Sequence, residues 1–154
     1  MVYGCGISVR VCIWKKIMDQ SFEGKPVVLF DGWCRLCSSF AGWLIRRDKK
    51  GKLLLAPLQG ETAGKLLAGF GYESPPEDSI ILIQGKKLFL RSTAVLSIMK
   101  ILGAPWSWFY PLIYIPRTLR DFVYRLVAAV RYRVLGRRGS CRVPGEDEKG
   151  RMLP

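Results

Sequence analysis

The segment from Asp31 to Cys37 constrains this chain most, because it places Cys34 and Cys37 three positions apart between two different hydrophobic patterns. It follows the apolar run at residues 26–30, whose length and branched side chains are typical of a buried strand. It precedes residues 38–47, where apolar side chains recur at helical spacing. The two thiols are therefore expected where a strand ends and a helix begins.

Two thiols at this spacing predict reversible disulfide chemistry, as in thioredoxin-like redox sites. Cys37 lies one helical turn after Cys34 on the same face, so the two sulfurs are expected to reach each other. A thiol attacks as a thiolate, which the positive end of a helix and the neighbouring Arg35 favour. We therefore expect Cys34 to attack, a mixed disulfide to form between Cys34 and the substrate, and Cys37 to resolve it.

Two neighbouring residues each allow two interpretations. Asp31 is either a buried acid that accepts or returns the proton of Cys37, or a turn residue, because Asp-Gly favours a tight change of direction after a strand. Trp33 is either an aromatic contact for the substrate beside the sulfur or a cover over the core. The sequence leaves both pairs of interpretations open.

The alternative for the cysteine pair is half of a structural zinc site. Such a site needs four ligands, and this chain has no histidine and no second Cys-x-x-Cys. The other cysteines, Cys5, Cys12 and Cys141, are scattered along the sequence. Redox chemistry is favoured and no metal is expected. The sequence also has no phosphate-binding loop and no flavin or nicotinamide motif, so no cofactor is expected.

The length and composition indicate one globular domain. The chain has 154 residues, of which 49% are hydrophobic. Its 25 basic and 12 acidic residues give a formal charge of +13, which is compatible with nucleic acid, an anionic membrane surface or an acidic protein as a partner. Five cysteines are too few for a disulfide scaffold, and their number is odd, so a reducing cytoplasm is expected.

The order of predicted elements points to an α/β fold. Strands are expected at residues 27–30, 52–56, 79–83 and 87–90. Helices are expected from Cys34 to about Arg47, over residues 61–68, and up to Leu102 from an N-cap at Ser92 or Thr93. Right-handed crossovers then give a thioredoxin-like four-stranded mixed sheet with flanking helices and an added C-terminal helical segment. The cysteine pair lies at the carboxyl end of the first strand, where ligand chemistry is expected.

The C-terminal part is basic and rich in aromatic residues. Residues 105–116 carry five aromatic side chains between prolines, and eight arginines but one acid, Asp121, lie between Arg117 and Arg142. From residue 117 the apolar side chains mark one helix face: Leu119, Phe122, Val123, Leu126, Val127 and Val130. This face either packs on the sheet, leaving the arginines in solvent, or docks an acidic protein or membrane headgroups. Nucleic acid is disfavoured, because no zinc-finger or RNA-recognition motif accompanies the charge.

With Asp31, Cys34 and Cys37 in this arrangement, the chain resembles the DCC family of predicted thiol-disulfide oxidoreductases. Further landmarks are Ala56-Pro57-Leu58-Gln59, Arg91-Ser92-Thr93-Ala94, Leu102-Gly103-Ala104-Pro105-Trp106, Ile115-Pro116-Arg117 and Arg131-Tyr132-Arg133, closing with Cys141-Arg142-Val143-Pro144. The resemblance covers residues 25–144, with an N-terminal extension at 1–24 and a tail at 145–154.

The resemblance implies a thioredoxin-like fold and dithiol-disulfide exchange with a disulfide-containing protein or a small thiol. It does not identify the reductant or oxidant that recycles the protein. Cys141 is either a third redox thiol near Cys34 and Cys37, which its place in the closing motif favours, or a free cysteine in a loose tail. A second function class is a non-catalytic binding module that docks an acidic partner or an anionic membrane through its arginine-rich helix.

Overall fold

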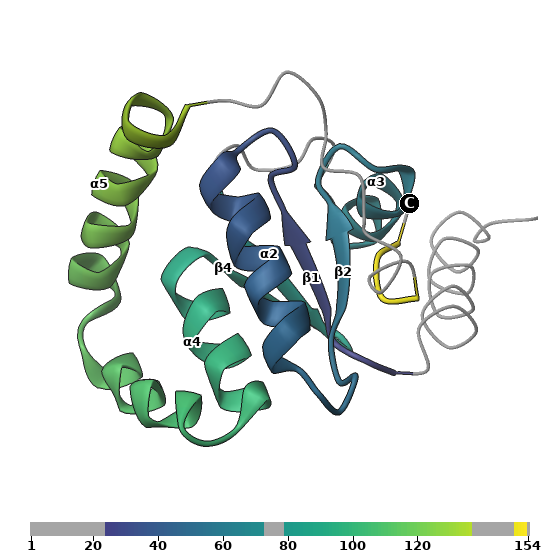
Figure 1. Ribbon diagram of the computed structural model, residues 1–154, viewed down its shortest axis with the longest axis horizontal. Coiled ribbons are helices and arrows are strands. Elements are labelled where there is room, and N and C mark those ends of the chain that lie inside the picture. Colours follow the sequence, from purple (N-terminus) through teal and green to yellow (C-terminus); the bar gives the residue numbers. More distant parts are fainter. Residues whose placement is uncertain (1–23, 73–78, 137–149, 154) are drawn as a thin grey trace, which may run out of the picture.

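The computed structural model describes residues 24–72, 79–136 and 150–153, which form a four-stranded mixed sheet flanked by helices (Figure 1). The strands are β1 (Val27–Phe30), β2 (Leu54–Pro57), β3 (Ile81–Gln84) and β4 (Lys87–Leu90). Their order is β2-β1-β3-β4, with β1 parallel to β2 and β3 antiparallel to both of its neighbours. The predicted thioredoxin-like sheet is confirmed.

Helices cover both faces of this sheet (Figure 1). They are α2 (Arg35–Arg47), α3 (Glu61–Gly69), α4 (Arg91–Leu102), the 3-10 helix η1 (Trp106–Tyr114) and α5 (Arg117–Leu135). Side chains of β1 alternate between the two layers. Val28 and Phe30 pack with α2 and α4, whereas Val27 and Leu29 pack with α3. Because β1 is covered on both faces and paired on both edges, it is fully buried, as its apolar run predicts.

Some element boundaries differ from the predicted ones. Strand β2 runs from Leu54 to Pro57, whereas the predicted strand is 52–56. It can include a proline because β2 is an edge strand, where a missing N–H costs no ladder hydrogen bond. Strand β3 begins two residues later than the predicted strand, at Ile81. Ser92 and Thr93 are not the N-cap of α4: that helix begins at Arg91, directly after β4. The hydroxyl of Ser92 instead donates to the Asp121 carboxylate on α5.

The interpretation that α5 packs its apolar face on the body of the protein is wrong. Helix α5 lies beside α4 and α2, at one side of the molecule (Figure 1). Asp121 and Arg131 are buried there. The exposed side chains are the apolar ones: Leu119, Phe122, Val123, Leu126, Val127, Val130 and Val134.

Polar contacts explain this orientation. Asp121 meets Ser92 of α4, and the hydroxyl of Tyr124 accepts a hydrogen bond at 2.9 Å from the backbone N–H of Ile80. Arg131 lies two turns further along the same face and contacts α2. Specific polar partners on neighbouring elements thus hold α5, rather than burial of its apolar stripe.

Residues 150–153 lie along the outer edge of β2. The N–H of Leu55 donates to the carbonyl of Arg151 at 2.9 Å, and the N–H of Leu153 donates to the carbonyl of Leu55 at 2.8 Å. The Arg151 guanidinium donates to the carbonyl of Asp48 at 2.6 Å. This short segment covers an edge strand that would otherwise expose unpaired backbone groups. The N-terminal extension and Cys141 lie outside the described residues.

Replacing Tyr124 with phenylalanine should destabilise the protein, because it leaves the buried N–H of Ile80 without this acceptor. We expect the free energy of unfolding to fall by about 1–3 kcal/mol in urea denaturation. Tyr114→Phe is the matched control, since Tyr114 is 88% exposed. Equal stabilities for the two variants would contradict the docking of α5 through Tyr124.

Candidate active site

The two cysteines lie where the sequence predicts, between β1 and α2. Cys34 is the N-cap of α2, and its sulfur accepts a hydrogen bond at 3.4 Å from the backbone N–H of Cys37. The sulfur thus takes the place of the oxygen that caps most helices, at the positive end of the helix dipole. Both thiols are free and buried, with Cys34 1% and Cys37 3% exposed.

Asp31 lies in the loop before Cys34, and both of its predicted features are present. Its Oδ1 accepts hydrogen bonds from the N–H of Trp33 and from Nε2 of Gln59, each at 2.9 Å. The first contact is that of a turn residue. The carboxylate is also buried, at 7% exposure, as a proton-accepting acid near a thiol would be.

Gln59, directly after β2, connects this loop to the neighbouring strand. Its Oε1 accepts a hydrogen bond at 3.0 Å from the N–H of Gly32, while its Nε2 donates to Asp31. Ser38 fixes the loop from the other side, since its hydroxyl donates to the carbonyl of Gly32 at 3.2 Å. The loop that holds the carboxylate is therefore fixed from both β2 and α2.

Arg131 of α5 completes the site, 94 residues after Cys37 in the chain. Its Nη1 donates to Sγ of Cys37 at 3.1 Å, and its Nη2 lies 3.8 Å from Oδ2 of Asp31. The guanidinium side chain is 3% exposed. A role for Arg131 in the site was not predicted from the sequence, because the arginines of this helix were expected to face solvent. The available signal was the spacing of Arg131 from Asp121 and Tyr124, which places all three on one face.

The surroundings of Cys37 keep it protonated at neutral pH. Burial raises the pKa of its thiol to about 12. The Arg131 guanidinium opposes this rise, whereas the charges of Cys34 and Asp31 add to it. Since the thiolate is the nucleophile, Cys37 is poorly suited to attack first.

An apolar pocket of about 210 Å³ opens beside Cys37, between α2, α4 and α5. Phe40, Val95 and Val127 are among the side chains that line it, and Arg131 is the charged residue in its wall. The pocket lining is otherwise largely apolar, and Cys37 rather than Cys34 is the thiol in its wall.

The structure brings three of the predicted site residues together with two further ones. Asp31, Cys34 and Cys37 form one connected group with Gln59 and Arg131. Trp33 and Arg35 lie at the surface next to this group, with Trp33 40% exposed. Cys141 lies outside the described residues. Within the described part of the chain, no group of three or more His, Cys, Asp or Glu side chains could hold a metal ion.

The raised pKa of Cys37 predicts a loss of stability in alkali. Below pH 9 the Cys37 thiol keeps its proton in both the folded and the unfolded chain. Between the ordinary thiol pKa of 9.0 and the folded-state pKa of about 12, only the folded chain keeps this proton. Stability should therefore fall as pH rises through this range, and fall less in Cys37→Ala. Urea unfolding under reducing conditions, at about pH 8 and about pH 11, measures the difference. An equal loss of stability in the wild type and in Cys37→Ala would contradict the raised pKa of Cys37.

Comparison with known proteins identifies the family of this chain. Residues 28–137 match the family model of the DCC1-like thiol-disulfide oxidoreductases. The chain is 34% identical over 128 residues to the uncharacterized protein YuxK of Bacillus subtilis, covering 83% of this chain and 93% of that protein. It is also 34% identical over 131 residues to the chloroplastic DCC family protein At1g52590 of Arabidopsis thaliana, covering 83% and 76%. No solved structure matches. The chain therefore belongs to the DCC1-like thiol-disulfide oxidoreductase family.

Proposed function

We propose that this protein exchanges disulfides through its Cys34-x-x-Cys37 dithiol, with Cys34 attacking and Cys37 resolving. The observation that carries the proposal is the difference between two adjacent buried thiols. Cys34 caps a helix and accepts an N–H hydrogen bond, whereas burial holds Cys37 protonated with a pKa of about 12. The helix N-terminus favours attack by Cys34, whereas burial disfavours Cys37 as the first nucleophile.

The reaction has two steps when the protein acts as a reductant. The Cys34 thiolate attacks a substrate disulfide, forming a Cys34–substrate bond as the substrate S–S bond breaks, and the leaving thiolate takes up a proton. Cys37 then loses its proton and attacks Sγ of Cys34, which releases the second substrate thiolate. The substrate gains two electrons and the protein is left with a Cys34–Cys37 disulfide.

The second step needs Cys37 as a thiolate. Two residues of the site are suited to help the thiol lose its proton. The Arg131 guanidinium, 3.1 Å from the sulfur, stabilises the thiolate as it forms. Asp31, on the other side of the same guanidinium, is the proposed acceptor of the Cys37 proton. Arg131 thus lowers the cost of an ionisation that burial opposes.

The substrate in this proposal is a disulfide-containing protein or small thiol compound, recycled by a separate dithiol or disulfide partner. The sulfurs carry the electrons, so the exchange itself uses no cofactor. A cytoplasmic location is part of the same proposal. It rests on the five cysteines, which are too few and odd in number for a secreted disulfide scaffold.

The order of attack can be tested with single cysteine variants and a disulfide-bonded peptide. Cys37→Ser should accumulate a mixed disulfide with the peptide, because Cys34 attacks and nothing resolves the intermediate. Cys34→Ser should accumulate little, because Cys37 remains protonated. Mass spectrometry after acid quenching measures both. Accumulation in Cys34→Ser alone would reverse the roles, and accumulation in neither would remove the proposal.

Arg131→Met should slow the resolving step while leaving the first attack almost unchanged. Loss of a cation in contact with the sulfur raises the pKa of Cys37 further, so resolution should slow roughly tenfold or more near neutral pH. Its rate should also keep rising to a higher pH than in the wild type. Quenched-flow measurement of the mixed disulfide separates the two steps.

Arg133→Met is the matched control for this experiment, since Arg133 is an exposed arginine on the same helix. Equal resolving rates in the wild type and Arg131→Met would show that the guanidinium does not assist Cys37. A similar slowing in both variants would point to the overall charge of the protein instead.

A further inference from the structure

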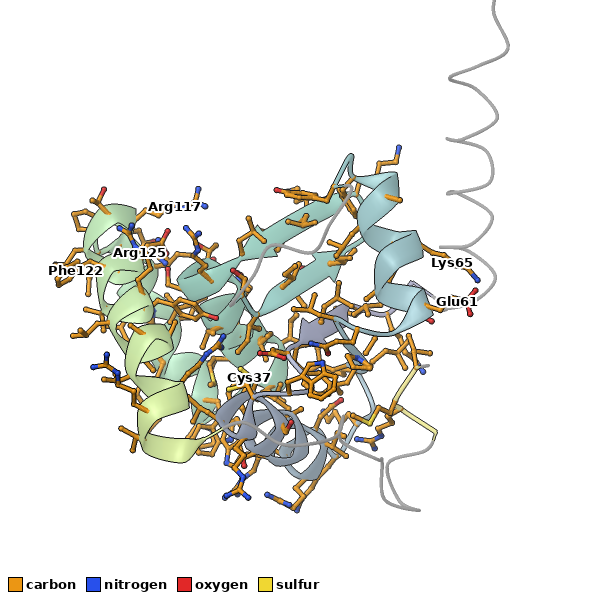
Figure 2. All side chains as sticks on the ribbon, turned by 90° about the horizontal axis from the view of Figure 1, so that it is seen from above. Cys37, Glu61, Lys65, Arg117, Phe122 and Arg125 are labelled. Atoms are coloured by element: carbon orange, nitrogen blue, oxygen red, sulfur yellow. The ribbon has the colours of Figure 1, made fainter. Side chains whose placement is uncertain are left out.

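The outer face of α5 is apolar and has no covering element among the described residues. Six side chains from five successive turns form it, namely Leu119, Phe122, Val123, Leu126, Val130 and Val134, exposed by 41% to 75%. Figure 2 shows Phe122 directed away from the body of the protein, on the side of α5 opposite Cys37. Water-exposed apolar patches of this extent on a monomer mark a surface for a partner or a membrane.

The neighbouring helix η1 extends this surface with aromatic residues. Trp108 is 79% exposed, Phe109 52% and Tyr114 88%. A groove of about 510 Å³ between α4, η1 and α5 continues it inward, with Leu112, Leu119 and Val123 in its walls. Leu112 of η1 thus shares one apolar groove with side chains of α5, and exposed aromatic residues lie on the same short helix as Leu112.

The exposed charged side chains of α5 that the structure describes are all arginines. Arg125 and Arg133 are exposed on α5, next in the sequence to the exposed apolar side chains Leu126 and Val134. Asp121, the acid of α5, points inward, where it binds Ser92 and pairs with Arg117 at 3.5 Å. The exposed side of the helix therefore presents arginines and apolar groups without a carboxylate.

We propose that the outer face of α5, together with η1, docks the protein onto an anionic lipid bilayer surface. Arginines beside a stripe of Phe, Leu and Val, with Trp and Tyr at one end, suit the boundary between headgroups and acyl chains. An anionic surface complements the arginines, whereas a neutral apolar partner would leave them without a counter-charge. None of the described helices is long and apolar enough to cross a membrane, so this contact lies in the plane of the interface.

This docking does not depend on the proposed disulfide exchange, because the two use opposite faces of α5. The inner face carries Arg131 to Cys37, and the outer face carries Phe122 and Leu126. Substitutions on the outer face should therefore change lipid binding and leave exchange with a soluble peptide unchanged.

Cosedimentation of the full, reduced chain with lipid vesicles tests the proposal. We expect binding to vesicles of phosphatidylcholine with phosphatidylglycerol, weakened by salt, and little binding to phosphatidylcholine alone. Phe122→Ser with Leu126→Ser should weaken binding at least roughly tenfold, since both side chains would lose their contact with lipid. Both are exposed, so circular dichroism and thermal unfolding should match those of the wild type.

A charge-matched pair of double variants separates a specific face from overall charge. Arg125→Gln with Arg133→Gln removes two charges from α5 and should weaken binding strongly. Lys86→Gln with Lys87→Gln removes two exposed charges from the β3–β4 turn and the first residue of β4, and should weaken binding much less.

Three results would overturn the proposal. One is no binding to anionic vesicles at low salt. Another is equal weakening by the two charge-matched doubles. The third is a self-associated wild type that becomes monomeric in Phe122→Ser with Leu126→Ser and does not bind vesicles, because a second copy would then cover this face.

Discussion

The contact of the Arg131 guanidinium with Cys37 and Asp31 determines how the C-terminal helix is placed and how the dithiol is charged. An arginine stays protonated in a protein, so a buried one needs anionic or polar partners. Asp31 and the Cys37 sulfur supply them at 3.8 Å and 3.1 Å. With Arg131 turned inward, helical geometry turns Phe122, Leu126 and Val130 outward. The polar interior of the site and the apolar exterior of α5 are thus two consequences of one contact.

The same contact explains how the two thiols can differ although they are one turn apart. Burial favours the neutral form of the Cys37 thiol, as it does for any acid. Cys34 is placed at a helix N-terminus with an N–H directed at its sulfur, whereas Cys37 contacts the Arg131 guanidinium, which lowers the cost of its ionisation. A dithiol needs this difference, because one sulfur must attack while the other waits as a thiol.

Features set by local pattern were predictable from the sequence, and those set by long-range pairing were not. The apolar run of β1 and the helical spacing after Cys34 placed the dithiol correctly. The periodicity of apolar residues in a segment shows which of its own side chains are buried, and hence whether it is a strand or a helix. The amphipathic pattern of α5 showed that one face is apolar, yet it could not show that Asp121, Tyr124 and Arg131 find partners on α4, the loop before β3, and α2. Gln59 is part of the Ala56-Pro57-Leu58-Gln59 motif, but the sequence did not indicate its role, because its partner Asp31 lies 28 positions earlier.

The most direct test of this account is the redox state of the protein equilibrated across graded thiol–disulfide buffers and then alkylated. The account predicts one two-electron transition, in which Cys34 and Cys37 lose their alkylation sites together. That transition should be absent in Cys34→Ser and Cys37→Ser, and its midpoint potential should assign the protein as a reductant or an oxidant. Thiols that remain separately alkylated until strong oxidation modifies each one would contradict the account.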